Sequence, residues 1–232
     1  MDQKISFTLF RLKKGSKLWA FKQMASLPAE FSKANGCTFS KLMGSGSGLG
    51  FNIKPNFGVY ALMMVWKDGQ NLEAFINHHD AFLEYKSHCD EVFTLVGRAY
   101  AAHGTWDQIM PFDIQPKETN TQQRMVLTRA SIKWYKLFQF WKYVPETSKA
   151  IAKAEGRLLS IGVGEWPWIQ QATISLWESE EAMKKYAYSN VAHLGAIKKT
   201  KELQWYSEEL FARFIPEKSI GNWSGLSVSL DF

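Results

Sequence analysis

The chain has little cysteine and no long apolar run, and both absences narrow the class of protein. Of its 232 residues only Cys37 and Cys89 are cysteines, and their separation matches no metal or redox spacing. We therefore expect reduced thiols in an intracellular protein. No window approaches the roughly 18 uninterrupted apolar residues of a spanning helix, and the acidic, alternating N-terminus is unlike a signal peptide. These features predict a cytoplasmic protein that at most touches the inner face of a membrane.

Concentrated charge and the familiar nucleophilic or nucleotide-binding constellations are also missing. The formal net charge is +6, but Lys and Arg are scattered and no recognition motif accompanies them, so we expect no nucleic-acid partner. A mildly basic surface still suits contact with anionic lipid. The glycine-rich segment 44–56 lacks the Lys-Ser/Thr of a P-loop. We expect a flexible insertion there, and whether it forms a lid stays open.

What the chain does have is an internal repeat. Trp66 and Trp177 each follow an apolar run, and each is followed nine residues later by an aromatic residue, Phe75 or Tyr186. Both pairs are 111 residues apart, whereas an earlier pair of matching lysines is 119 residues apart. The first half therefore carries about eight extra residues, which the 44–56 insertion explains.

Each half shows the same order of secondary-structure elements. Alternating apolar residues predict strands, and helical periodicity with capping residues predicts helices. The expected strands are 5–12, 38–44, 59–66 and 91–102, then 124–132, 157–165, 171–179 and 207–217. The expected helices are 17–34 and 70–88, then one that begins near Pro145 and one that Ser179 caps and that runs to about Leu203.

The order β-α-β-β-α-β is that of the ferredoxin-like unit. We therefore predict an α+β protein of two tandem ferredoxin-like repeats, 1–102 and 124–232, joined by a linker at 103–123. Each sheet would carry helices on one face, so the two remaining faces must cover each other. The expected architecture is an α+β barrel, which single-repeat proteins form by dimerising.

His193 lies in the last predicted helix, and the repeat serves as its internal control. A shift of 111 residues matches His193 to Phe82, so an imidazole stands where the first half has an apolar ring. Gly195 matches Glu84, and a glycine within a helix costs about 1 kcal/mol relative to alanine. A helix accepts that cost where a macrocycle, or a crossing helix, approaches its backbone.

An imidazole alone restricts the kind of metal site. A neutral imidazole is a good ligand for iron, zinc or copper. A site of protein ligands alone needs more of them than the second half supplies, whereas haem iron needs one proximal histidine. Haem is therefore the metal group that a lone His193 permits, and an ordinary core histidine is the open alternative.

Several blocks of the second half resemble the signature of a known family. The blocks are VLTRASI, FWKYVPETSKA, SIGVGEWP, QATISLWESEEAMKKYAYSNVAHLGAI and WYSEELFARFIP, in this order within 126–216. They are similar to those of the spheroidene monooxygenases, which are acyclic-carotenoid C-2 oxygenases of carotenoid biosynthesis. The first half matches more loosely. The resemblance implies a haem-containing enzyme with His193 as the axial ligand.

The implied activity is that of a haem b monooxygenase that hydroxylates an acyclic carotenoid and forms a ketone in a second round. It implies a long apolar polyene as substrate, dioxygen, and an external reductant such as ferredoxin. A lipid-soluble substrate also implies peripheral membrane contact. Two rivals stay open: a haem enzyme of the same barrel fold that dehydrates aldoximes or uses peroxide, and a non-enzymatic protein that carries haem or a small apolar ligand.

Arg129 and Ser131 are the predicted catalytic residues. Period-2 alternation places them on one face of their strand. Arg129 would pair with a haem propionate or polarise dioxygen, and the alternative is an ion pair with Glu165 or another acid of the same sheet. Both residues would also suit the aldoxime or peroxide chemistry.

Three further residues are predicted to contact the cofactor or the substrate. Tyr186 would line the pocket, with ordinary packing as the alternative. Gly162 and Gly164 lie inside a predicted strand, where glycine weakens packing but lets another group approach the backbone. A bulge is the alternative for both glycines.

Overall fold

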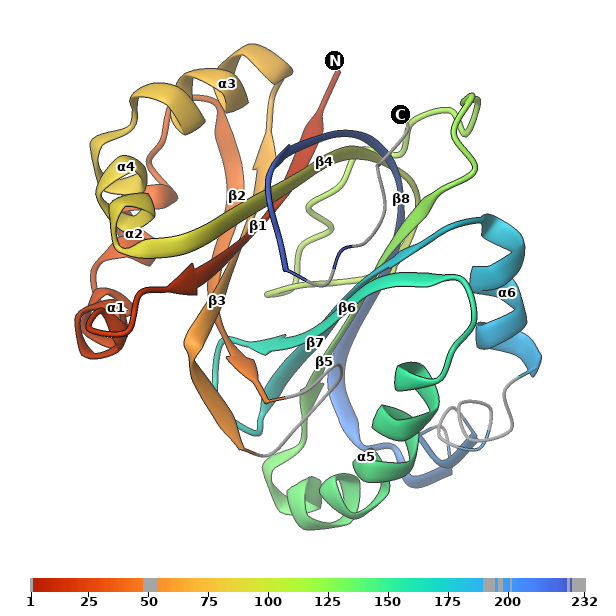
Figure 1. Ribbon diagram of the computed structural model, residues 1–232. Coiled ribbons are helices and arrows are strands. Elements are labelled where there is room, and N and C mark those ends of the chain that lie inside the picture. Colours follow the sequence, from red (N-terminus) through yellow and green to blue (C-terminus); the bar gives the residue numbers. More distant parts are fainter. Residues whose placement is uncertain are drawn as a thin grey trace.

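Eight segments with alternating apolar residues form strands, and these strands close into one barrel (Figure 1). The computed structural model describes residues 2–47, 54–189, 195, 198–200, 202–224 and 226, without the side chains of 145–150 and 189. The strands are β1 (Lys4–Leu12), β2 (Cys37–Gly46), β3 (Pro55–Trp66), β4 (Cys89–Gly104), β5 (Arg124–Ile132), β6 (Arg157–Gly164), β7 (Gln170–Trp177) and β8 (Tyr206–Gly221). All eight strands were predicted, with ends that differ by at most four residues.

The two halves contribute their strands to the barrel in the same way. The order around the barrel is β1-β3-β2-β6-β7-β5-β8-β4, so each half supplies four adjacent antiparallel strands. The halves meet edge to edge at two seams. The β4–β8 seam is long, whereas the β2–β6 seam consists of the pairs Gly44–Gly164 and Ser45–Val163. The α+β class is confirmed, and edge-to-edge joining is what closes the barrel.

The helices lie outside the barrel (Figure 1). They are α1 (Lys17–Gln23), α2 (Leu27–Phe31), α3 (Gly69–His78), α4 (Asp80–Ser87), the 3-10 helix η1 (Trp134–Lys136), α5 (Leu137–Ala152) and α6 (Glu180–Ser189). The first four flank the first half, and α5 and α6 flank the second (Figure 1). Ser179 caps α6 as predicted, because its Oγ accepts a hydrogen bond of 3.0 Å from the Ala182 N–H.

Two predicted helices of the first half are each divided in two. The segment 17–34 forms α1 and α2, because Pro28 has no N–H and lies in the first turn of a new helix. The segment 70–88 forms α3 and α4, which are separated by His79 in an extended conformation. The apolar periodicity continues across both breaks, so it did not reveal them.

The prediction that a helix begins near Pro145 was wrong. α5 begins at Leu137, and Pro145 lies in its interior. Leu137, Phe140 and Val144 recur at helical spacing and pack with Ile132 and neighbouring residues in one apolar cluster. This apolar face stabilises the helix upstream of the proline.

A single apolar core fills the barrel interior. Inward-facing residues of both halves belong to it, among them Phe7 of β1, Met125 of β5 and Phe214 of β8. Trp106 and Phe112, from the segment predicted as a linker, are buried in the same core. The segment between β4 and β5 is therefore part of the folded interior as well as a connection.

The outer faces of the two halves are covered differently. Between the first sheet and α1–α4 lies a second large core with many bulky side chains. On the outer face of the second sheet, the apolar cluster found among the described residues consists of Ile132, Phe140, Val144 and Trp205, with partly buried neighbours. In the part of the chain that the structure describes, no helix is both long enough and apolar enough to cross a bilayer.

Candidate functional site

The strand registers give a residue-by-residue match between the halves. Lys4 pairs with Trp66 across β1 and β3, and Arg124 pairs with Trp177 across β5 and β7. The sequence repeat therefore has a structural counterpart. Trp66 lies against Phe75 with ring centroids 5.0 Å apart, and Trp177 lies against Tyr186 at 5.2 Å.

Tyr186 is thus placed on the side of α6 that faces the outer surface of the second sheet. It is half-buried, and this burial raises the pKa of its hydroxyl to about 12. The hydroxyl therefore stays protonated at neutral pH. The packing against Trp177 repeats a contact of the first half, so packing accounts for at least one side of this ring.

The same register exposes differences between the two outer faces, one of which runs the other way, because Ser6 of the first half matches the larger Val126. At four matched positions the first half has a large side chain and the second a small one. The matched pairs are Phe10 with Ala130, Leu42 with Gly162, Leu62 with Thr173, and Met64 with Ser175. The four large side chains belong to the outer core of the first half. The second sheet therefore offers a floor of small residues on the face that α6 covers.

In the first half, Phe82 lies over the positions that match this floor. Its ring is buried, 5.9 Å from the Phe10 ring and 5.0 Å from the Phe75 ring. The matching residue of the second half is His193, which lies outside the described residues. Its floor position has Ala130 in place of Phe10.

The two predicted glycine contacts are both in β6, on this outer face. Gly162 is buried and pairs with Thr173. Gly164 has a structural reason of its own, because a Cβ atom there would lie 2.5 Å from the Gln170 carbonyl oxygen. The floor also contains the buried Ser160 hydroxyl, for which the described residues supply no hydrogen-bond partner.

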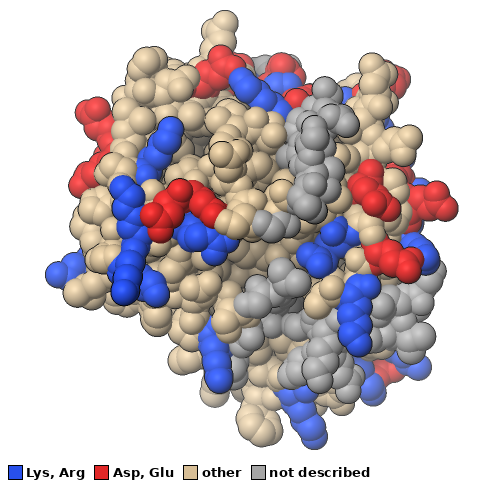
Figure 2. All heavy atoms as spheres, in the orientation of Figure 1, with Lys and Arg blue, Asp and Glu red and all other residues tan. Residues whose placement is uncertain are grey.

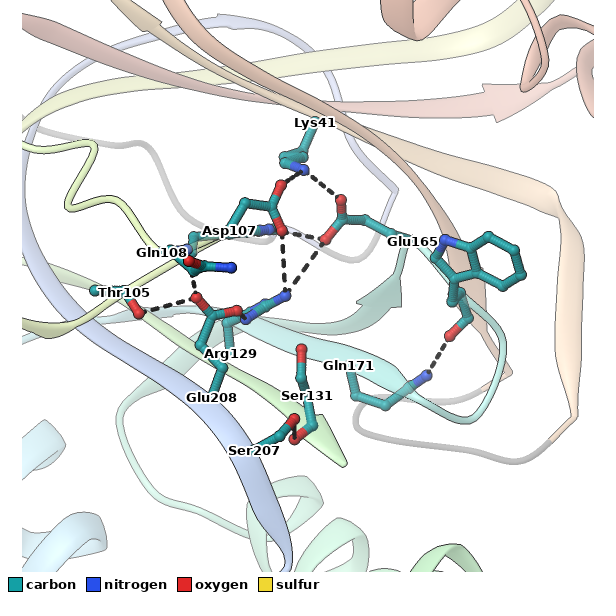
Figure 3. Close-up of polar contacts among 12 residues, drawn as sticks. Lys41, Thr105, Asp107, Gln108, Arg129, Ser131, Glu165, Gln171, Ser207 and Glu208 are labelled. Atoms are coloured by element: carbon teal, nitrogen blue, oxygen red, sulfur yellow. Dashed lines mark hydrogen bonds and ion pairs between the residues drawn. The ribbon is translucent and has the colours of Figure 1, made fainter. Parts of the chain in front are cut away.

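Arg129 and Ser131 lie on the opposite face of the second sheet, inside the barrel. Arg129 is almost completely buried and forms an ion pair with Glu208 of β8, a neighbouring strand (Figure 3). The ion-pair alternative for Arg129 is therefore observed, with Glu208 as the close partner. Glu165 lies 4.0 Å from the guanidinium.

This ion pair belongs to a larger charged cluster near one end of the barrel core, formed by Lys41, Asp107, Arg129, Glu165 and Glu208 (Figure 3). Lys41 of β2 pairs with Asp107, and with Glu165 at 2.6 Å. Trp106 donates a hydrogen bond of 2.8 Å to Glu165. The cluster joins strands of both halves to the segment between them.

The charges of the cluster stabilise one another. Burial alone would lower the pKa of Lys41, but hydrogen bonds to Asp107 and Glu165 outweigh it and raise the pKa. Burial alone would raise the pKa of Glu208, but hydrogen bonds from the Gln108 N–H and from Arg129 outweigh it and lower the pKa. Both groups are charged at neutral pH.

These contacts use only part of the hydrogen-bonding capacity of Arg129. Its guanidinium lies 5.3 Å from the centre of the Trp106 ring. Its Nε and Nη2 atoms are buried and have no hydrogen-bond partner among the described residues. Within the same residues, no three His, Cys, Asp or Glu side chains come together as metal ligands.

The predicted site residues therefore fall into two groups on opposite faces of one sheet. Tyr186, Gly162 and Gly164 lie on the outer face with α6, and Arg129 and Ser131 lie inside the barrel. A group held against the outer face would be separated from Arg129 by the sheet itself. Sequence reasoning missed Lys41, Asp107 and Glu208, because their proximity depends on how the barrel closes.

Comparisons with known proteins place the chain among named relatives. No family model matches it. It is 32% identical over 225 residues to the spheroidene monooxygenase of Cereibacter sphaeroides, which covers 96% of this chain and 69% of that protein. It is 33% identical to the spheroidene monooxygenase of Rhodobacter capsulatus, over 95% of this chain and 92% of that protein. The corresponding protein of Rubrivivax gelatinosus is 30% identical over 90% of this chain and 80% of its own length.

Solved structures with the same fold include two of aldoxime dehydratases. One, in complex with butyraldoxime, has a TM-score of 0.55 at 13% identity and covers 92% of this chain and 79% of that one. The other has a TM-score of 0.60 at 11% identity and covers 94% of this chain and 83% of that one. At such identities the likeness concerns the fold alone.

Proposed function

The chain belongs to the spheroidene monooxygenase family, and on this premise we propose that it is a haem-dependent monooxygenase. Its substrate is an acyclic carotenoid of the spheroidene type, which it hydroxylates and, in a second round, converts to a ketone. An external reductant such as ferredoxin supplies the electrons. The names of the relatives support the reaction class and the substrate class, and the haem is argued from the residues of this chain.

The observation that carries the haem proposal is the floor of small residues on the second sheet. A flat macrocycle needs space between a sheet and the helix that supplies its ligand. The positions of Ala130, Gly162 and Thr173 lack the large side chains that fill the matching space in the first half, whereas the small Ser175 lies beside Val126, which is larger than its counterpart Ser6. The residues present therefore fit such a group.

Each of these residues has a role in the proposed site. His193 would hold the iron, and Gly162 would let the haem approach the backbone of β6. Tyr186 and Trp177 would close one side of the pocket and exclude water. Haem, when bound, supplies a redox iron that activates dioxygen, and the protein positions the polyene carbon next to it.

For Arg129 and Ser131 we propose a structural role in place of the catalytic role expected from the sequence. Both lie inside the barrel, across the sheet from α6, and Arg129 is engaged by Glu208. Arg129 holds the charged cluster together, and neither residue touches haem or substrate in the proposed site.

We also propose that the halves are tandem ferredoxin-like repeats, 1–102 and 124–232. Support comes from the identical order of their four strands and from the matched Trp66–Phe75 and Trp177–Tyr186 contacts. In this proposal the segment 103–123 is a linker, some of whose residues are buried in the barrel core.

The first experiment tests the haem site. The visible spectrum of protein expressed with ample haem is expected to show a Soret band, and His193→Gly is expected to lose it. Imidazole added to His193→Gly should restore the band by replacing the missing side chain. A double variant with first-half residues, Ala130→Phe with Thr173→Leu, should fill the floor and bind no haem. Thr128→Val, on the same face where both halves have threonine, is the matched control.

Normal haem binding by both His193→Gly and the filled double variant would contradict the proposed site. Circular dichroism of each variant separates loss of haem from loss of fold.

The second experiment tests the reaction. Haem-loaded protein with reduced ferredoxin, an acyclic carotenoid and ¹⁸O₂ is expected to yield product labelled from dioxygen. Oxygen-independent turnover of aldoximes would favour the dehydratase alternative instead. Tight haem binding without any turnover of polyenes would favour a binding protein.

A further inference from the structure

We propose that one end of the molecule docks on an anionic lipid bilayer. The surface, called the aromatic end below, is formed by η1, the start of α5 and the turn between β6 and β7. Five aromatic side chains are exposed there, and their exposed fractions are 76% for Trp134, 61% for Tyr135, 90% for Phe138, 66% for Trp166 and 52% for Trp168. Scattered exposed apolar residues are ordinary, but a group of large aromatics marks an interaction surface.

The two parts of the aromatic end are held together by hydrogen bonds. The Ile132 N–H, at the end of β5, donates to the Ile169 carbonyl at 2.8 Å, so η1 begins beside the turn. The Trp141 indole N–H donates to the Trp168 carbonyl at 3.1 Å. The two segments that supply the exposed aromatics therefore lie side by side.

The pattern along α5 separates its packing residues from the exposed Phe138. Phe140 and Val144 are buried against the second sheet and account for the packing of the helix. Phe138 and Trp134 lie one turn apart on the solvent side. A helix with apolar residues on its solvent face as well as on its core face has a second surface to cover.

Charge decides in favour of an anionic bilayer as the partner. The stretch 133–145 contains Lys133, Lys136 and Lys142 and no Asp or Glu. The acid beside the turn, Glu165, directs its carboxylate to Lys41 and Trp106. Figure 2 shows tan and blue atoms at the lowest edge of the molecule, where η1 and the start of α5 lie in Figure 1. Trp, Tyr and Lys together are typical of side chains that sit at the headgroup level of a membrane.

Docking on a bilayer would give the enzyme access to a lipid-soluble substrate, and this relevance to catalysis rests on the proposed function. The aromatic end adjoins the end of the second sheet that includes Gly164 and Gln171, on whose outer face the proposed haem floor lies. A polyene dissolved in the bilayer would therefore reach the pocket without crossing water. Binding to lipid itself requires neither haem nor substrate, so it can be measured separately.

Flotation of the full chain with vesicles tests the surface. The wild-type protein is expected to float with vesicles that contain phosphatidylglycerol and to float less with phosphatidylcholine alone. Phe138→Ser with Trp166→Ser should reduce the bound fraction at least about fivefold, as should Lys133→Glu with Lys142→Glu. The matched controls, Leu83→Ser with Ile114→Ser and Lys67→Glu with Lys86→Glu, change exposed residues elsewhere and should float like the wild type.

Three outcomes would overturn the proposal. They are absence of wild-type flotation, equal flotation of the aromatic-end variants, and a wild-type dimer in solution that Phe138→Ser with Trp166→Ser dissociates. The last outcome would assign the surface to a second copy of the chain.

Activity separates this inference from the proposed function. The Phe138→Ser, Trp166→Ser variant should oxidise carotenoid in detergent at the wild-type rate and lose turnover of carotenoid embedded in vesicles. If vesicle binding fails while turnover in detergent persists, the docking surface is wrong and the monooxygenase stands. If flotation behaves as expected and no polyene is oxidised, the docking surface stands and the proposed monooxygenase activity is wrong.

Discussion

Two glycines face each other where β2 meets β6, and only one of them is required by its surroundings. Gly44 and Gly164 form one of the two residue pairs of this seam. A Cβ atom on Gly164 would lie 2.5 Å from the Gln170 carbonyl oxygen, whereas a Cβ atom on Gly44 would meet nothing within 4 Å. The close approach thus comes from the β6–β7 turn and not from the partner strand.

Gly164→Ala is therefore expected to lower the free energy of unfolding by about 1–3 kcal/mol, because the turn must move to admit the methyl group. Gly44→Ala is the matched control and should stay within about 1 kcal/mol of the wild type. Urea denaturation of both variants measures the difference. Equal stabilities would mean that the turn adjusts freely.

Glu208 makes the charged cluster sensitive to acid. The pKa of its carboxyl is lower in the folded protein than the ordinary value of 4.5. Its stabilisation is therefore complete at neutral pH and is lost as the pH falls below about 4.5 towards the lowered value. Protonation would remove the closest charged partner of the buried Arg129.

Glu208→Gln is expected to cost about 1–3 kcal/mol at pH 7, because it removes the closest charged partner of Arg129 and leaves only the longer ion pairs with Asp107 and Glu165. The gap between variant and wild type should narrow as the pH falls below about 4.5, since the wild-type carboxyl then also loses its charge. Urea midpoints measured from pH 7 to pH 3 check this. Glu84→Gln, on the solvent side of α4, is the control. A gap that stays constant with pH would contradict the role of this charge.

At the scale of elements, the segment between β4 and β5 behaves as part of the barrel. Trp106 is completely buried in the inner core, and its backbone forms a bridge with Ile109. Trp106→Ala is expected to lower the free energy of unfolding by about 3–5 kcal/mol through the cavity it leaves. Ile109→Ala, at a half-exposed neighbour, should cost about 0.5 kcal/mol or less. Thermal unfolding of both variants checks this, and a small effect of Trp106→Ala would make the segment a simple linker.

The elements also show which features can be predicted from the sequence. The strands could be predicted because alternation of apolar residues is a local signal. The break at His79 and the interior position of Pro145 could not, because packing against the sheet decides where a helix stops. The charged cluster was hidden for a different reason. Lys41 and Glu208 are brought together only by the seams of the closed barrel.

The small-residue floor could be predicted from the sequence only in part. The sequence repeat already matched Trp177 to Trp66, and the same shift matches Thr173 to Leu62. The matches of Gly162 to Leu42 and of Ala130 to Phe10 need the strand registers, because the shift between the halves changes along the chain.

At the scale of the whole molecule, the shared interior predicts one cooperative unfolding unit. Residues of both halves and of the connecting segment belong to one core, and removing either half would leave the edges of β2 and β4, or of β6 and β8, unpaired. Unfolding in urea followed by tryptophan fluorescence and by circular dichroism should give coincident transitions. Two separate transitions, or a folded monomeric fragment 1–123, would show that the halves are independent.

For the proposed haem site, the pairing of unlike halves on one chain also predicts a stoichiometry. Two identical protomers joined by the same edges would be obliged by symmetry to hold two cofactors or none. Here Leu62 and Phe10 belong to the outer core of the first half, whereas the matching residues of the second half, Thr173 and Ala130, are smaller. Titration with haemin should therefore saturate at one equivalent per polypeptide.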